Sequence, residues 1–170
     1  MRAPMLLAVL ALAACGTVDQ NPPEGAAAVE SWLKGGAYLQ WHCESAPHMA
    51  RSPSPHGYNR ICSNDLLSQA GAGEYPVGAA AVKELYDDGG KNIVGYAVER
   101  HRTAGKTGDT WYWYERVPLT SAAPHDSVTG VVADATGVSG PAKDICVGCH
   151  QAAGSDAGHS GHDFVYTQVR

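Results

Sequence analysis

Apolar residues recur at helical spacing near the beginning of the chain and at strand spacing in its middle. From residue 24 to residue 40 they lie three or four positions apart, at Val29, Trp32, Leu33 and Ala37. This spacing predicts an amphipathic helix that is interrupted at Gly35-Gly36. Residues 45–58 contain several prolines and no periodicity, which indicates a loop, and residues 64–70 resemble a short capped helix.

The middle of the chain predicts three strands, over residues 79–86, 93–101 and 111–117. Glycine-containing turns separate them at residues 87–90 and 104–108, and such turns are typical of hairpins. We therefore expect an antiparallel meander at the centre of the fold.

The pattern in the last part of the chain is less regular, and it predicts three further elements. A strand is expected over residues 128–133, a helix from Ser139-Gly140-Pro141 to near Gly154, and an alternating extended segment over residues 163–169. Together these elements predict one α+β domain over residues 24–170, an antiparallel β-sheet with a few helices.

The first residues have the pattern of an export signal. Residues 1–14 contain one positive charge at Arg2 and an apolar run too short to span a bilayer. The run ends in Leu12-Ala13-Ala14-Cys15, which resembles the lipobox of bacterial lipoproteins; the alternative is an ordinary secretory signal with a chance cysteine. We expect a signal peptide over residues 1–14, a lipidated tether over residues 15–23 beginning at Cys15, and a place in the periplasm or at the cell surface.

Composition narrows the choice of partners. The 170 residues include 17 acidic and 12 basic side chains, for a formal net charge of −5 at pH 7 with histidine neutral. No basic cluster stands out, so nucleic acid is not an expected partner. No later apolar run approaches membrane-spanning length, so contact with a membrane is expected only through the lipid anchor.

The run Cys146-Val147-Gly148-Cys149-His150 has the spacing of a c-type haem attachment motif. On one helical turn the two thiols can form thioethers with haem vinyl groups, and the adjacent imidazole of His150 can ligate the iron. Two alternatives are a zinc site, for which the other histidines lack suitable spacing, and a thioredoxin-like pair, which belongs in an α/β chain. Export favours one covalent haem c near the C-terminus.

Cys43 and Cys62 are the two thiols that remain after lipid and haem are assigned. In an oxidising compartment such thiols pair, and closing a loop of about twenty residues would stabilise the fold by roughly 3 kcal/mol. The alternative is two free or metal-bound thiols. We expect the disulfide.

Two common classes of haem protein do not match the chain. An electron carrier of the mitochondrial cytochrome c kind has its motif near the N-terminus and a methionine ligand far downstream, whereas no methionine follows His150 here. The only methionine after Cys15 is Met49, in a predicted loop. The four-helix cytochromes c′ carry a late motif, but the strand periodicity of residues 79–117 disagrees with a helical bundle.

A different family shares the order of these features. A Pro-Gly-led strand (Tyr75 to Tyr86), aromatic strands, a late CxxCH and the closing run Asp163-Phe164-Val165-Tyr166-Thr167 resemble the cytochrome P-460 and cytochrome c′-beta family over roughly residues 25–170. The resemblance implies an antiparallel sheet with a few helices, often a homodimer, and a five-coordinate haem with an open distal face. The P-460 branch oxidises hydroxylamine and links a lysine to the porphyrin, whereas the c′-beta branch binds nitric oxide or carbon monoxide.

The resemblance also implies roles for single residues. Lys83 matches the family's lysine, and its alternative is a solvent-facing strand lysine. Glu99 and Glu115 lie on neighbouring predicted strands and could relay protons, unless both are exposed. Phe164 is the only phenylalanine, so the phenylalanine pair that caps the distal site in c′-beta members is absent.

Other residues have candidate roles around the cofactor. Arg100 and Arg116 could pair with haem propionates or lie at the surface. The run Trp111-Tyr112-Trp113-Tyr114 places two aromatic rings on each face of a strand, one pair in the core and the other available to wall the haem.

These observations predict a tethered monohaem protein. Its haem iron would serve small-molecule redox chemistry, on hydroxylamine or a nitrogen oxide, or ligand binding, with a redox partner protein. The alternative is a non-catalytic electron-transfer cytochrome with both axial positions filled.

Overall fold

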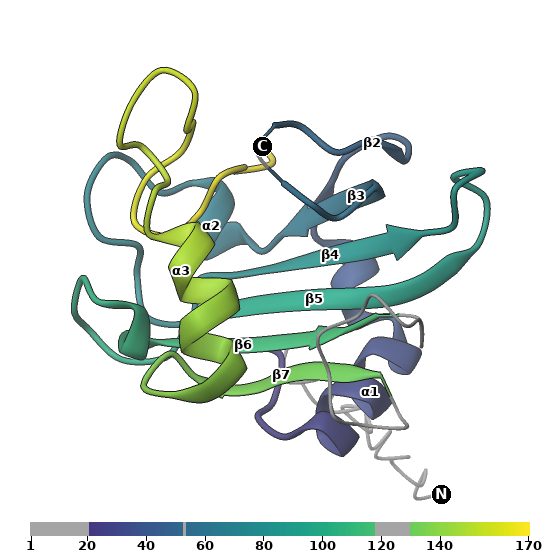
Figure 1. The fold of residues 1–170 in the computed structure, drawn as a ribbon, viewed down its shortest axis with the longest axis horizontal. Coiled ribbons are helices and arrows are strands. Elements are labelled where there is room, and N and C mark those ends of the chain that lie inside the picture. The colour runs from purple at the N-terminus through teal and green to yellow at the C-terminus, as the bar shows by residue number, and fades with distance from the viewer. Residues whose placement is uncertain (1–20, 53, 118–129) are drawn as a thin grey trace, which may run out of the picture.

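The computed structural model describes residues 21–52, 54–117 and 130–170, and in these ranges one antiparallel sheet of seven strands dominates (Figure 1). Its strand order is β1-β3-β4-β5-β6-β7, and β2 also pairs with β3. The strands are β1 (His42–Cys43), β2 (His48–Met49), β3 (Tyr58–Ser63), β4 (Ala80–Tyr86), β5 (Ile93–His101), β6 (Trp111–Arg116) and β7 (Val131–Thr136). The expected α+β class is confirmed.

Short helices complete the fold. They are α1 (Ala26–Gly35), the 3-10 turns η1 (Ala37–Gln40) and η2 (Gly108–Thr110), α2 (Asp65–Ser68), the π-helical turn η3 (Ala142–Val147) and α3 (Gly148–His150). The predicted interruption of the first helix is present, since Gly36 adopts a left-handed conformation with φ of 69° and ends α1. None of the helices in the described ranges is long and apolar enough to cross a membrane.

The two faces of the sheet carry separate cores because side chains alternate along each strand. Even-numbered positions of β4 and β6, such as Val82, Tyr112 and Tyr114, pack with Val29 and Leu33 of α1. On the other face, odd-numbered positions and the helix η3–α3 share a second core that includes Ala81, Trp111, Trp113, Ala142 and Cys146. In Figure 1 this helix crosses the sheet near one end of β5 and β6. The haem motif and α1 therefore lie on opposite faces.

The predicted loop over residues 45–58 is a partial error, since β2 lies inside it and β3 begins at Tyr58. β3 is an internal strand that pairs with β1, β2 and β4. The sequence does not predict an internal strand here because two of the buried residues of β3, Asn59 and Ser63, are polar. Apolar alternation, the usual signature of a half-buried strand, is therefore missing.

The C-terminal expectations need two corrections. The final helix ends in α3 at His150 rather than near residue 154. Residues 163–169 do not form an extended strand: Asp163 and Phe164 have φ angles of 44° and 70° and make a tight turn between His162 and Val165. The alternation of apolar and polar residues gave a wrong prediction here because the chain reverses direction within four residues.

Candidate functional site

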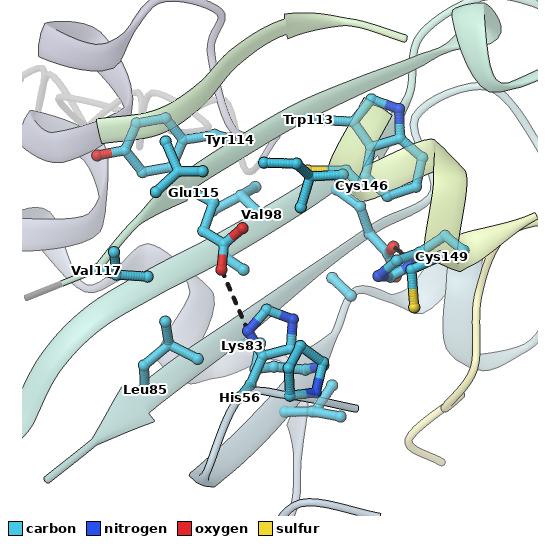
Figure 2. Close-up of a pocket in the computed structure, with 18 of the residues that line it drawn as sticks. His56, Lys83, Leu85, Val98, Trp113, Tyr114, Glu115, Val117, Cys146 and Cys149 are labelled. Atoms are coloured by element: carbon cyan, nitrogen blue, oxygen red, sulfur yellow. Dashed lines mark ion pairs between the residues drawn. The ribbon is translucent and has the colours of Figure 1, made fainter. Parts of the chain in front are cut away.

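A cavity of about 500 Å³ lies between the sheet and the helix η3–α3. Figure 2 shows the two cysteines of the haem motif at one end and Leu85 and Val117 at the other. The candidate catalytic and haem-binding residues from the sequence all line this one cavity: Lys83, Glu99, Glu115, Cys146, Cys149 and His150. The strand register explains the gathering, because Lys83 pairs with Ala97 and Ala97 with Glu115, which puts all three on one face.

The helix that carries the two thiols is held closely against the sheet edge. Cys146 is buried in η3 and Cys149 is half-buried in α3, and neither is in a disulfide. A side chain at Gly108 would overlap Val147, and one at Gly137 would overlap both Val147 and the Gly108 carbonyl. These two glycines allow the helix to approach closely, which fixes both sulfur atoms at the cavity wall.

His150 is oriented by a backbone carbonyl. Its Nδ1 donates a hydrogen bond to the carbonyl oxygen of Phe164 at 2.7 Å. The ring is held between Trp113 and Tyr166, with centroid distances of 4.9 Å and 5.5 Å in edge-to-face geometry. Because Nδ1 carries the donated proton, Nε2 is the nitrogen left free to ligate a metal, as is usual for histidine ligands.

The carbonyl that orients His150 comes from the strained turn at Asp163 and Phe164. A left-handed conformation is costly for a bulky side chain, and such strain persists only where surrounding contacts enforce it. Here the backbone N–H of Tyr75 donates to Asp163 Oδ2 at 2.8 Å. Gly161, with φ of 88°, packs against the Val165 carbonyl where a side chain has no room. The tail is thereby folded so that the Phe164 carbonyl faces the imidazole.

Glu99 approaches the same imidazole without a hydrogen bond. Its Oε2 lies 3.1 Å from His150 Nδ1, but the single proton of that nitrogen is donated to Phe164. This buried oxygen has no other hydrogen-bond partner in the described ranges. The carboxylate therefore acts on His150 through its charge, which would favour a positive charge on the imidazole or on a cation bound to it.

Lys83 projects into the cavity from β4 and is not a solvent-facing lysine. Its ammonium has no hydrogen-bond or ion-pair partner within the described part of the chain. Burial lowers the pKa of Lys83, although the negative charges of Glu99 and Glu115 partly oppose the shift. The neutral amine, which is the nucleophilic form, is therefore favoured more than in an ordinary lysine.

Glu115 has a partner that the sequence did not reveal. Its Oε1 lies 3.2 Å from His56 Nδ1, and both side chains are largely buried. The ion pair is drawn in Figure 2. His56 comes from the proline-rich loop before β3, whose position over the cavity has no signature in strand or helix periodicity. Nδ1 of His56 is directed at a carboxylate, and its Nε2 has no hydrogen-bond partner among the described residues.

No family model, curated protein or solved structure matches the chain. Its function must therefore be inferred from the geometry of the cavity.

The residues of the cavity fit a covalently attached haem. Two unpaired cysteines and an oriented histidine lie at its wall, and its volume is within the range of about 300–1,000 Å³ usual for cofactor pockets. A zinc site fits poorly, because a structural zinc needs four ligands and a catalytic zinc needs three from the protein. In the described ranges no group of three or more His, Cys, Asp or Glu side chains could hold a metal ion.

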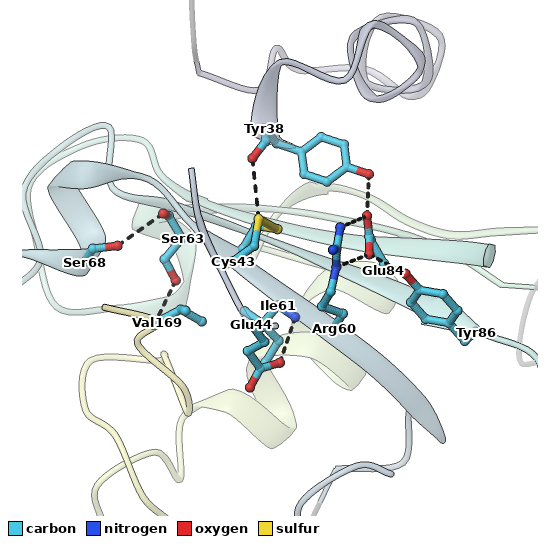
Figure 3. The surroundings of a disulfide bond; sticks show 11 residues. Tyr38, Cys43, Glu44, Arg60, Ile61, Ser63, Ser68, Glu84, Tyr86 and Val169 are labelled. Atoms are coloured by element: carbon cyan, nitrogen blue, oxygen red, sulfur yellow. Dashed lines mark hydrogen bonds and ion pairs between the residues drawn. A yellow bond between two sulfur atoms is a disulfide. The ribbon is translucent and has the colours of Figure 1, made fainter. Parts of the chain in front are cut away.

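The other predicted residues lie away from the cavity. Cys43 and Cys62 form the expected disulfide, directly opposite each other in the β1–β3 register (Figure 3). Met49 is 59% exposed on β2 and does not line the cavity. Cys15 lies outside the described residues.

Arg100 and Arg116, for which propionate pairing and a surface position were the two alternatives, have carboxylate partners near α1. Arg100 bonds to Glu24, and Arg116 bonds to Glu30 of α1, so both guanidinium groups are already paired on the α1 side of the sheet. In the β5–β6 register Arg100 pairs with Tyr112 and Arg116 pairs with Tyr96, and both tyrosines pack in the α1 core. Of the aromatic run, Trp113 lines the cavity, Trp111 lies in the core on the same face of the sheet, and Tyr112 lies in the α1 core.

Glu84 is a buried carboxylate on the α1 side and is fully satisfied. It accepts hydrogen bonds from Arg60, Tyr38 and Tyr86 at 2.7–3.0 Å, as Figure 3 shows. A buried charge with this many donors is typical of a structural ion pair rather than a reactive group.

Proposed function

We propose that this chain is an exported monohaem lipoprotein that holds one haem c in the cavity and uses it for small-molecule redox chemistry or ligand binding. The observation that carries the proposal is the arrangement of the CxxCH segment: both thiols line the cavity, and His150 Nε2 is left free by the Nδ1 bond to Phe164. A haem bound there would supply a redox-active iron with His150 as one axial ligand.

The chain's own residues would shape the chemistry beyond the iron. His56, Lys83 and Glu115 line the cavity from the loop before β3, from β4 and from β6. Redox reactions of hydroxylamine or nitrogen oxides move protons together with electrons, and the His56–Glu115 pair can accept or deliver a proton inside the cavity. Apolar residues such as Leu85, Val94 and Val132 line the same cavity.

Lys83 is the residue that we propose for a link to the porphyrin, as the resemblance to the P-460 branch implies. In such a link a new N–C bond replaces one N–H and one C–H bond, and two electrons pass to an oxidant such as hydrogen peroxide. The lowered pKa of Lys83 favours the neutral amine that this bond requires. Intact mass of wild type and Lys83→Ala tests it: a link makes the wild-type adduct lighter by two hydrogens, and the variant restores the unlinked mass.

The test of haem attachment uses the two cysteine pairs of the chain. After acid–acetone extraction, wild type and Cys43→Ala/Cys62→Ala should both keep the haem, whereas Cys146→Ser/Cys149→Ser should lose it. Haem that is extracted from wild type, or zinc recovered in its place, would overturn the proposal.

His56 supports a second candidate function, electron transfer with both axial positions filled. It shares the cavity with His150, and its Nδ1 is likewise engaged, which is the pattern of an oriented metal ligand. The resting spin state separates the two functions. A high-spin wild type supports small-molecule chemistry, whereas a low-spin wild type that becomes high-spin in His56→Ala supports electron transfer. His48→Ala, which alters a histidine outside the cavity, is the matched control.

The proposal extends to location and partners. Lipid on Cys15 would attach the protein to a membrane in the periplasm or at the cell surface, and a redox partner protein would exchange electrons with the haem. The family resemblance further implies that the protein forms a homodimer.

A further inference from the structure

A row of aromatic rings leads from His150 into the core beneath the cavity. The Trp113 ring is 4.9 Å from the His150 ring between centroids, and Trp111 is 6.1 Å from Trp113. Tyr75 follows at 6.1 Å from Trp111, in edge-to-face geometry. Each ring is in contact distance of the next, so the row is continuous from the proposed iron ligand to Tyr75.

The row ends at a paired tyrosine and histidine. The Tyr75 and His162 rings are stacked, with centroids 4.4 Å apart and an interplanar angle of 17°. The Tyr75 hydroxyl lies 3.4 Å from His162 Nδ1. Tyr75 is 1% exposed, so the imidazole rather than water is the base beside its phenol.

The indole N–H groups of the row lack such a base. Trp111 Nε1 is buried without a hydrogen-bond partner in the described ranges, and Trp113 Nε1 donates to the carbonyl of Gly108, a very weak base. An indole that loses an electron here keeps its proton and remains a strong oxidant. A tyrosine whose phenol can release its proton to a neighbouring imidazole loses an electron more easily. Oxidised Tyr75 is therefore more stable than an oxidised Trp111 or Trp113.

We propose that electrons pass along these rings to an oxidised haem and that Tyr75 is the residue that is finally oxidised. The inference depends on the proposed haem. Burial, with the charges of Glu99 and Asp163, raises the pKa of Tyr75, so the resting phenol keeps its proton. Only the loss of an electron makes transfer of that proton to His162 favourable.

The step balances with hydrogen peroxide as the oxidant. A haem bound in the cavity would supply the site at which the O–O bond of peroxide breaks and takes up two electrons, with solvent providing the protons for oxygen released as water. One electron would come from the haem iron, which would rise by one oxidation state, and the other from the Tyr75 ring, through Trp111 and Trp113. The Tyr75 O–H bond breaks, and an N–H bond forms at His162 Nδ1. The product is a neutral tyrosyl radical beside an imidazolium.

The route can be tested by electron paramagnetic resonance on haem-loaded protein frozen after mixing with peroxide. Wild type should give a tyrosyl signal, and Tyr75→Phe, which keeps the ring and its packing, should reduce it at least tenfold. Tyr112→Phe is the matched control: Tyr112 is equally buried and bonded to Asp134, but it lies on the α1 side of the sheet. This control should retain the signal.

Two further variants test the relay and the base. Trp111→Phe interrupts the row, and His162→Phe keeps a stacked ring without the proton acceptor; each should reduce the Tyr75 signal and speed bleaching of the haem by peroxide. Tryptic mapping with a nitroso radical trap should place the adduct on Tyr75. A tyrosyl signal of unchanged size in Tyr75→Phe, or an adduct elsewhere, would overturn the route while leaving the haem proposal intact. Failure of the haem proposal is seen earlier, as protein without covalent haem.

Discussion

At the scale of single residues, the chemistry of the cavity depends on partners as much as on residue type. His150 has an oriented ring because a backbone carbonyl accepts its Nδ1 proton, whereas the Lys83 ammonium has no hydrogen-bond or ion-pair partner among the described residues. The strand pattern predicted that Glu99 and Glu115 lie on neighbouring strands, and the register of β4, β5 and β6 puts Glu115 on the same face as Lys83. The strand pattern could not predict His56, which a loop delivers, or the Phe164 carbonyl, because a backbone group carries no sequence signature.

Lys83 should lower the stability of the fold at neutral pH. A lysine whose pKa is lowered on folding binds fewer protons in the native than in the unfolded chain, so stability rises with pH up to the ordinary value of 10.5. Lys83→Met removes this dependence and should raise the free energy of unfolding at pH 7, on the order of 1 kcal/mol. In urea unfolding, the free energies of unfolding of wild type and Lys83→Met should approach each other as pH rises. The wild-type sample must be one in which intact mass shows that Lys83 is not linked to haem. A constant difference would contradict the buried ammonium.

At the scale of elements, the regular strands were predictable and the irregular connections were not. Predicted strands over residues 79–86, 93–101 and 111–117 match β4, β5 and β6 closely, because apolar alternation and glycine turns determine both. β3 was missed because its burial involves polar side chains, and the turn at residues 162–165 because long-range contacts enforce its strain. Local pattern therefore predicted the sheet on which the site is built but not the loops that complete it.

Packing of the helix η3–α3 against the sheet should be weakened by a single methyl group added at Gly108. A Cβ there would overlap the Val147 side chain, and such overpacking costs about 1–3 kcal/mol. Gly108→Ala should lower the free energy of unfolding by that amount, and Val147→Ala in the same chain should recover part of the loss. Gly71→Ala, where nothing lies within 4 Å, is the control. Additive effects of the two substitutions would show that the contact is not the cause.

The disulfide should stabilise the edge of the sheet through the chain between its cysteines. It joins residues 19 positions apart, and closing a loop of this size contributes about 3 kcal/mol in the chain-entropy model. Cys43→Ala/Cys62→Ala should lose about that much in urea unfolding, and reductant should weaken the wild type but not the variant. Two alkylatable thiols in freshly purified wild type would show that the bond does not form.

At the scale of the whole molecule, one sheet separates two environments. The α1 side is a packed core with paired charges, whereas the charged groups of the cavity side have few or no partners among the described residues. The described chain begins at residue 21, a few residues after Cys15, so a lipid there would hold the domain close to a membrane surface.

Lipidation at Cys15 should determine where the protein is found. Cys15→Ser removes the thioether site, so the protein should leave the membrane fraction or remain unprocessed. Fractionation and intact mass measure both outcomes. A variant that stays membrane-bound with an unchanged processed mass would contradict the lipid anchor.

The burial of Cys146 has a consequence for the order of assembly. Every strand of the sheet precedes the haem motif in the chain, and once η3 packs on the sheet, the Cys146 thiol is only 9% exposed. An attachment enzyme could not reach that sulfur in the finished fold. If haem is attached as proposed, the thioethers must form while the last helix is still free, and docking of that helix then becomes the closing step of maturation.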